Sequence, residues 1–124
     1  MDEVNRKVSV DVLTRLRDEL RRFAADRDWE QFHSPKNLAS ALAVEAAELL
    51  EPFQWLTEEQ SRQLTAEQSE AVREEMADVL LYLIHLADKL DIDLATAASD
   101  KIVRNSAKYP VEKARGSSKK YTDL

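Results

Sequence analysis

The feature that most constrains the fold is residues 71–90, with the sequence AVREEMADVLLYLIHLADKL. Its apolar residues recur every three or four positions, the spacing of one face of an α-helix: Val72, Met76, Val79, Leu83, Leu86 and Leu90. Between Val79 and Leu86 only Tyr82 and His85 interrupt the apolar sequence. This pattern predicts a helix covered on several sides, by its own domain and by a second subunit. Glu75 and Asp78 lie on or beside the apolar stripe, where a carboxylate is unusual unless it has a specific role.

Composition favours one all-α domain. The chain has 124 residues with one Gly and three Pro, and strong helix formers are abundant. It has no Cys, which excludes disulfides and thiolate metal sites. No stretch approaches the roughly 20 apolar residues of a membrane span, and residues 1–12 lack a signal-peptide core, so we expect a cytoplasmic protein. The expected domain is 1–124, with residues 1–8 and 111–124 as flexible tails.

Three further helices are expected around this long one. Ser9 is a plausible N-cap for a helix that ends near Asp26, and Ser34-Pro35 begins a helix that ends near Phe53. Thr57 and Thr65 each precede a Gln by three positions, which is typical of a capping box. The first would cap one short turn, and the second would open the long helix. Asp93 caps a fourth helix, from Leu94 to about Lys108.

The net charge of −6 is distributed unevenly. Residues 101–120 hold seven basic residues against one acid, a local charge of +6 that leaves −12 on the remainder. An acidic body argues against duplex nucleic acid as a partner, because such binding requires neutralisation of phosphates. A basic tail beside acidic residues suits a small phosphorylated ligand that is bound through a metal ion.

Two acidic pairs are the strongest candidates for chemistry. Glu45 and Glu48 lie three residues apart on the second expected helix, and Glu75 and Asp78 are three apart on the third. This spacing places both members of a pair on one helix face. If the two helices pack together, four carboxylates converge, at a cost of several kcal/mol per ion unless cations neutralise them. Oxygen ligands select Mg²⁺ or Mn²⁺, and a two-metal arrangement can activate water for attack on phosphorus.

Other residues are candidates for ligand contacts. Lys101, Asn105 and Lys108 or Tyr109 recur at helical spacing on the fourth helix, where Lys101 would screen phosphate charge and Asn105 would hydrogen-bond a sugar or base. Trp29, Trp55 and Tyr82 are candidates for stacking on a nucleobase, although Trp and Tyr are more often core or interface residues. His85, inside the apolar helix, is interpreted as a core histidine. Four-helix di-iron proteins use Glu-x-x-His pairs, whereas the matching positions here read Glu45-x-x-Glu48 and Glu75-x-x-Asp78, which argues against a di-iron site.

Four segments together resemble the MazG-like all-α nucleoside triphosphate pyrophosphatases, and most closely their dCTP pyrophosphatase branch. They are EAAELLEPFQW (45–55), EEMADVLLYL (74–83), KIVRNSAKYPV (101–111) and RGSSKKYTDL (115–124). The resemblance implies a helical protomer, a four-helix bundle that assembles as a dimer or a dimer of dimers, with active sites at subunit junctions. The tail 115–124 would close over the site.

The resemblance also implies an activity. Such enzymes use Mg²⁺ to split the α–β phosphoanhydride of a nucleotide into a monophosphate and pyrophosphate, and dCTP or modified pyrimidine deoxynucleotides are the expected substrates. Glu45, Glu48, Glu75 and Asp78 would be the catalytic metal ligands. The substrate-binding candidates would be Trp29, His33, Trp55, Tyr82, Lys101, Asn105 and Tyr109. Two alternatives remain open: a noncatalytic helical interaction module, and a related dUTP- or phosphoribosyl-ATP-type pyrophosphohydrolase.

Overall fold

The computed structural model describes the backbone of residues 3–124 and the side chains of residues 12–124. The helices in chain order are α1 (Glu3–Asp26), η1 (Glu30–Phe32), α2 (Pro35–Leu50), α3 (Glu58–Arg62), α4 (Ala66–Lys89), α5 (Leu94–Lys108), α6 (Val111–Ala114) and η2 (Tyr121–Asp123). The described residues contain no strand, which confirms the all-α class. None of the helices described combines the length and apolar character that crossing a bilayer requires.

Side-chain caps begin four of the described helices, as the sequence predicts. Ser34 caps α2, and Asp93 caps α5. Thr57 and Thr65 form complete capping boxes with Gln60 and Gln68, so that α3 and α4 begin at Glu58 and Ala66. These caps satisfy backbone N–H groups that the first helical turn leaves without an intrahelical partner.

Two predicted helix boundaries are wrong. α1 begins at Glu3 and runs through Ser9, because residues 3–8 are also compatible with a helix and extend it past the expected cap. α2 ends at Leu50 and not near Phe53. Pro52 lacks an N–H group, and its ring would clash with the preceding turn of a continuing helix.

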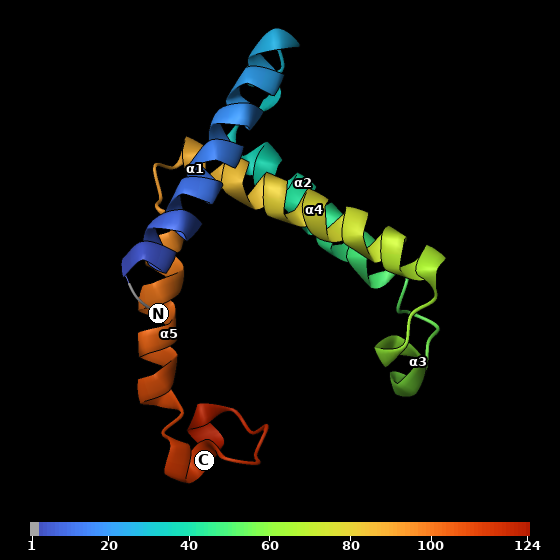
Figure 1. The fold of residues 1–124 in the computed structure, drawn as a ribbon, viewed down its shortest axis with the longest axis vertical. Helices are drawn as coiled ribbons and strands as arrows, with labels where there is room; N and C mark the ends of the chain where they lie inside the picture. The colour runs from blue at the N-terminus through green and yellow to red at the C-terminus, as the bar shows by residue number, and fades with distance from the viewer. Residues whose placement is uncertain (1–2) are drawn as a thin grey trace. The chain divides into compact units, whose positions relative to one another are not determined.

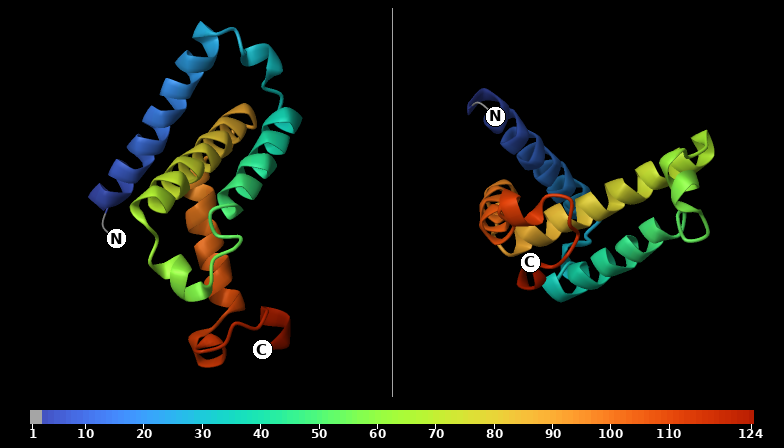
Figure 2. Two further views of the ribbon diagram at one scale, coloured as in Figure 1. Left: turned by 90° about the vertical axis from the view of Figure 1, so that its right-hand side faces the viewer. Right: turned by 90° about the horizontal axis from the view of Figure 1, so that it is seen from below.

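The described chain separates into two compact units, one ending at Ile92 and one spanning Asp93–Leu124. In the first unit α2 and α4 lie side by side and antiparallel, joined by α3, and α1 crosses the C-terminal half of α4 (Figures 1 and 2). Because α2 and α4 are adjacent along much of their length, side chains on their facing sides come together.

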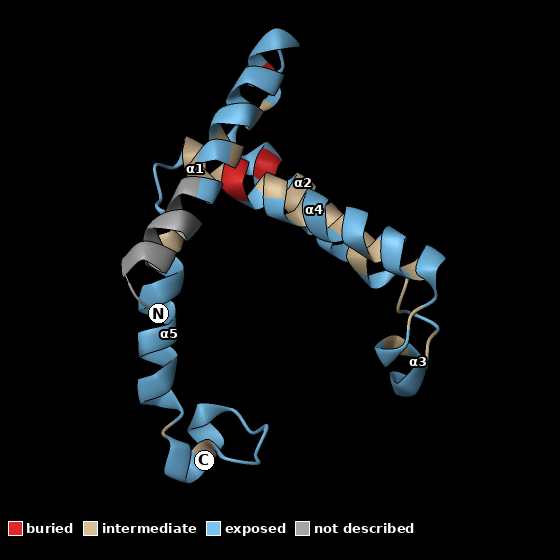
Figure 3. Cartoon of the chain, in the orientation of Figure 1, coloured by how far each residue is buried: buried red, intermediate tan, exposed pale blue. Residues whose placement is uncertain are grey.

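The buried side chains of the first unit gather where α1, α2 and α4 meet (Figure 3). They are Ala24, Leu38, Ile84, Ala87 and His85. The apolar surface of α4 is only partly covered within this unit, since Met76, Leu80 and Leu83 remain exposed. The expectation that its own domain covers this helix on several sides is therefore met only near its C-terminal end.

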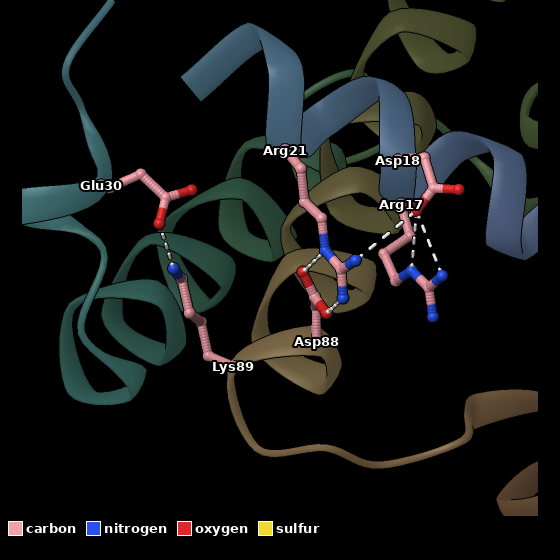
Figure 4. Close-up of polar contacts among 6 residues, drawn as sticks. All are labelled: Arg17, Asp18, Arg21, Glu30, Asp88 and Lys89. Carbon is pink, nitrogen blue, oxygen red and sulfur yellow. Dashed lines mark hydrogen bonds and ion pairs between the residues drawn. The ribbon is translucent and has the colours of Figure 1, made fainter. Parts of the chain in front are cut away.

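Two ion pairs tie the end of α4 to the segments around it (Figure 4). Arg21 of α1 donates two hydrogen bonds to Asp88, with Nε lying 2.8 Å from Oδ2. Lys89 Nζ donates to Glu30 Oε2 of η1 at 2.8 Å. Asp88 is the more buried member of its pair, with a side chain 12% exposed, and its pKa is lowered by the hydrogen bond from Arg21. These pairs fix α1 and η1 against the same turn of α4.

The second unit consists of α5, α6 and η2. The rings of Tyr109 and Tyr121 meet edge to face at 6.0 Å, and Lys108 lies over the Tyr121 ring. Helices α6 and η2 thus give regular structure to a segment in which the sequence shows no periodicity. The flexibility expected for residues 111–124 stays a prediction, and the prediction for residues 1–8 falls partly on residues 1 and 2, outside those described.

Candidate functional site

Three carboxylates meet on the facing sides of α2 and α4. Glu45 and Glu48 come from successive turns of α2, and Glu75 comes from α4. One oxygen of each lies within 4.8 Å of the others, and all three side chains are half-buried. Glu45, Glu48 and Glu75 therefore form an acidic cluster in the folded chain.

The surroundings of the acidic cluster raise the pKa of two of its carboxyl groups. Burial raises the pKa of Glu45 to about 7, helped by the adjacent Glu48 carboxylate and by the charges of Asp78 and Glu75. Burial also raises the pKa of Glu75, with Glu48 and Asp78 adding to the effect. Carboxylates that lose water and face one another hold their protons more tightly, because the charged form is destabilised on both counts.

Two oxygens of this cluster lack any hydrogen-bond donor. Glu45 Oε2 and Glu75 Oε2 are buried and have no partner among the residues whose side chains are described. Buried polar atoms are nearly always satisfied in native proteins, so two bare carboxylate oxygens side by side indicate a missing positive ligand. The donor set is oxygen alone, which fits a hard divalent cation. The acidic cluster could therefore hold a metal ion.

Asp78 lies outside this group of three. It is exposed, and it contributes to the wall of a neighbouring cavity. Its charge still raises the pKa of Glu45 and Glu75, so it lies in their electrostatic surroundings. The structure thus brings together three of the four predicted metal ligands, and the role of Asp78 as a ligand stays a prediction.

A cavity of about 440 Å³ adjoins this region, between α1, the η1 segment and α4. Its walls are mostly apolar or aromatic, and it is lined by Leu16, Glu19, Leu20, Phe23, Ala24, Trp29, His33, Asp78, Leu81, Tyr82 and His85. Apolar walls with a few polar groups are typical of pockets for small organic ligands. Asp78 belongs to this wall and its charge acts on Glu45 and Glu75, so we treat the acidic cluster and the cavity as neighbouring parts of one candidate site.

One side of the cavity is a series of rings in edge-to-face contact. Phe23 and Trp29 lie 5.6 Å apart between ring centroids, Trp29 and His33 lie 6.5 Å apart, and His33 and His85 lie 4.4 Å apart. Such geometry favours ring packing because the positive edge of one ring meets the negative face of the next.

Local backbone structure places this ring series. Asp28 adopts a left-handed conformation with φ of 55°, and the Trp29 N–H donates to the Ala24 carbonyl at 2.9 Å. This is the Schellman ending of a helix, with Asp where Gly is usual. It turns the chain sharply after α1 and sets Trp29 against Phe23. The Lys89–Glu30 ion pair then holds η1 against α4.

The predicted substrate-binding residues fall into three groups. Trp29, His33 and Tyr82 line the cavity. Trp55 follows α2, is 86% exposed, and lies outside the cavity lining. The remaining three belong to the second unit, where Lys101 and Asn105 are exposed on α5 and Tyr109 caps its C-terminal end.

Several residues of the cavity wall are not singled out by the sequence, among them Phe23 and Glu19, and the sequence analysis interprets His85 as a core residue. His85 is indeed buried, but it also forms part of the cavity wall. The available signal was a single histidine within an otherwise apolar helical stretch.

Comparisons with known proteins agree with this architecture. The profile of the MazG-like family matches residues 41–124. Mouse dCTP pyrophosphatase 1 is 48% identical over 104 residues, and the human protein of that name is 46% identical. Each alignment covers 82% of this chain and 61% of the relative, so the chain spans about three-fifths of their length.

A solved structure is also similar. It is the crystal structure of a pyrophosphatase from Archaeoglobus fulgidus, 41% identical, with a TM-score of 0.71 over 75% of this chain and 87% of that one. The family match covers most of the chain, and the helices superimpose on those of a related enzyme. The chain therefore belongs to the MazG-like family.

Proposed function

We propose that this protein is a Mg²⁺-dependent nucleoside triphosphate pyrophosphohydrolase that cleaves the α–β phosphoanhydride of a (d)NTP. The observation that carries this proposal is the acidic cluster, with two buried carboxylate oxygens that lack a donor beside a ring-lined cavity. The mammalian relatives named dCTP pyrophosphatase 1 and the archaeal pyrophosphatase support the same reaction.

In this proposal the acidic cluster holds Mg²⁺, with Mn²⁺ as a substitute, and Asp78 completes the ligand set. The bound ion would neutralise phosphate charge and make a water molecule more acidic. Glu45, Glu48 and Glu75 orient the ion, and their shared negative charge favours cations over the bare phosphate chain. Without the ion, burial and the neighbouring carboxylates raise the pKa of Glu45 to about 7, and a bound cation would favour its charged form instead.

The cavity would receive the base and sugar of the nucleotide. Trp29 and Tyr82 are the candidates for stacking on the base, and His33 for a polar contact with it. The cavity lining includes two acidic residues, Asp78 and Glu19, and therefore suits a neutral ring better than a phosphate. We assign Trp55, Lys101, Asn105 and Tyr109 to substrate binding as part of this proposal, and the tail 115–124 to closure over the site.

A pyrimidine deoxynucleotide is the proposed substrate, with dCTP or a modified form of it preferred. The names of the mammalian relatives support this choice. We further propose assembly as a homodimer or a dimer of dimers, because Met76, Leu80 and Leu83 form an exposed apolar surface on α4. A cytoplasmic location belongs to the same proposal.

The test is pyrophosphate release from a panel of nucleoside triphosphates, with and without Mg²⁺. We expect Mg²⁺-dependent release that is fastest with dCTP, and Glu75→Gln should reduce kcat to background while the helical circular dichroism is unchanged. Glu74→Gln is the matched control, because Glu74 is the adjacent residue of α4, is exposed, and lies outside the acidic cluster.

The same panel separates the alternatives. Fast release from dUTP or phosphoribosyl-ATP and not from dCTP would reassign the substrate while keeping the reaction. If no nucleotide released pyrophosphate and Mg²⁺ left the melting temperature unchanged, the noncatalytic interaction module would be the correct reading.

A further inference from the structure

The chain contains two histidines, and the structure places them in contact at the cavity wall. His85 comes from the C-terminal half of α4 and is 6% exposed. His33 follows η1, and its ring meets that of His85 edge to face, with 4.4 Å between centroids. The two side chains arrive from segments about fifty residues apart, so this contact is a product of the fold.

Each ring keeps a buried nitrogen that has no hydrogen-bond partner in the described part of the chain. These atoms are Nδ1 of His33 and Nε2 of His85. A histidine that serves only the core normally satisfies both nitrogens, because an unsatisfied buried polar atom destabilises the fold. Both histidines line one cavity, so a group bound there could supply the partners that the two nitrogens lack.

The charged groups near His85 are already engaged. On its own helix Asp88 accepts from Arg21, and Lys89 donates to Glu30 of η1. Burial lowers the pKa of His85, and His33 and Lys89 add to the effect, so the neutral form of its imidazole is favoured. A neutral imidazole offers one donor and one acceptor, and it does not attract an anion.

These properties define the chemistry of the missing group. Its polar atoms must pair with neutral donors and acceptors, which fits amide, amine and carbonyl groups and does not fit phosphate. The rest of it must be planar or apolar, because Phe23, Trp29 and Tyr82 supply aromatic walls. The polar edge of a nucleobase, with exocyclic amine or carbonyl groups beside ring nitrogens, satisfies both requirements.

We infer that His85, together with His33, hydrogen-bonds the polar edge of the substrate base and so determines which base the enzyme accepts. The inference rests on the proposed function and deepens it, since it assigns base selection to a residue of α4 that sequence reasoning had placed in the core. His85 is then a specificity-determining residue, distinct from the acidic cluster, which acts on the phosphates.

The test compares nucleotide preference in His85→Leu, which keeps similar volume but removes both nitrogens, and in His33→Phe, which keeps a ring. We expect KM for the preferred nucleotide to rise by about 10- to 100-fold, with kcat little changed and the preference over other bases reduced by a similar factor. Ile84→Val is the matched control, because Ile84 is the adjacent buried residue of α4 and is not among the residues that line the cavity. The Ile84→Val variant should prefer the same nucleotide as the wild type, by the same ratio.

An unchanged preference ratio in both histidine variants would overturn the inference while leaving the pyrophosphohydrolase assignment intact. If His85→Leu does not fold, as judged by circular dichroism, His33→Phe decides the question by the same ratio. If the wild-type enzyme releases no pyrophosphate, the proposed function fails and calorimetry with free deoxycytidine replaces the kinetic readout. Binding that is present in the wild type and lost in His85→Leu supports base recognition, and equal or absent binding in both overturns it.

Discussion

Neutralising Glu45 should stabilise the metal-free protein while it abolishes the activity. In Glu45→Gln the side chain keeps its size but no longer adds a negative charge to Glu48 and Glu75. The substitution thereby removes a charge that burial and, in second place, the neighbouring carboxylates destabilise, the two causes that raise the pKa of Glu45 to about 7.

The magnitude follows from that pKa. A rise from the ordinary value of 4.5 to about 7 corresponds to an upper limit of about 3 kcal/mol, at roughly 1.4 kcal/mol per unit. Glu45 is only half-buried, so solvent screening reduces the expected gain to about 1–2 kcal/mol at alkaline pH. For a chain of this length that is a rise in Tm of about 4–8 °C.

The pH dependence has a definite sign. Because the pKa of Glu45 is raised by folding, protonated Glu45 favours the folded state, and this contribution is complete below pH 4.5 and is lost as the pH rises through about 7. The wild type and Glu45→Gln should therefore melt together in acid, and the variant should melt higher above neutral pH. Added Mg²⁺ should raise the Tm of the wild type, since a ligand that binds only the folded state stabilises it, and should raise that of the variant much less.

Thermal melting followed by circular dichroism, from about pH 5 to about pH 8.5 and with or without Mg²⁺, measures both effects. Glu74→Gln is the control for loss of one carboxylate from α4, and its Tm should follow the wild type at every pH. The reasoning fails if Glu45→Gln melts below the wild type at alkaline pH, or if its advantage does not depend on pH.

Two predictions concern the frame around the cavity. Arg21→Ala should destabilise the fold by about 1–3 kcal/mol in urea unfolding, because it leaves Asp88 largely buried without its donor. Since the pKa of Asp88 is lowered in the folded state, this pair stabilises the protein above the ordinary carboxyl pKa of 3.8, and the difference from the wild type should fade as the pH drops below it. Leu38→Ala, at a residue 1% exposed, should cost about 2–5 kcal/mol in the same assay with an unchanged nucleotide preference, and a loss below 1 kcal/mol would show that α2 is not anchored there.

Local signals in the sequence were sufficient for most of the helices. The starts of α2, α3, α4 and α5 follow from Ser34, Thr57, Thr65 and Asp93, because a capping side chain bonds to the backbone only two or three residues away. The predicted start of α1 at Ser9 was wrong, because Ser can also lie inside a helix. A residue that can cap a helix does not begin one when the residues before it also favour the helix.

The sequence by itself determined the all-α class and the pairing of Glu45 with Glu48 and of Glu75 with Asp78, because helical periodicity is a local property of the chain. Which of these acids meet was decided by the packing of α2 against α4, which brings Glu75 to Glu45 and Glu48 and leaves Asp78 on the cavity wall. The contact between His33 and His85 likewise depends on the Schellman turn after α1 and on the ion pairs at the end of α4. Contacts between residues distant in the sequence depend on helix crossing and on burial from water, and neither quantity is encoded in the spacing of residues along one helix.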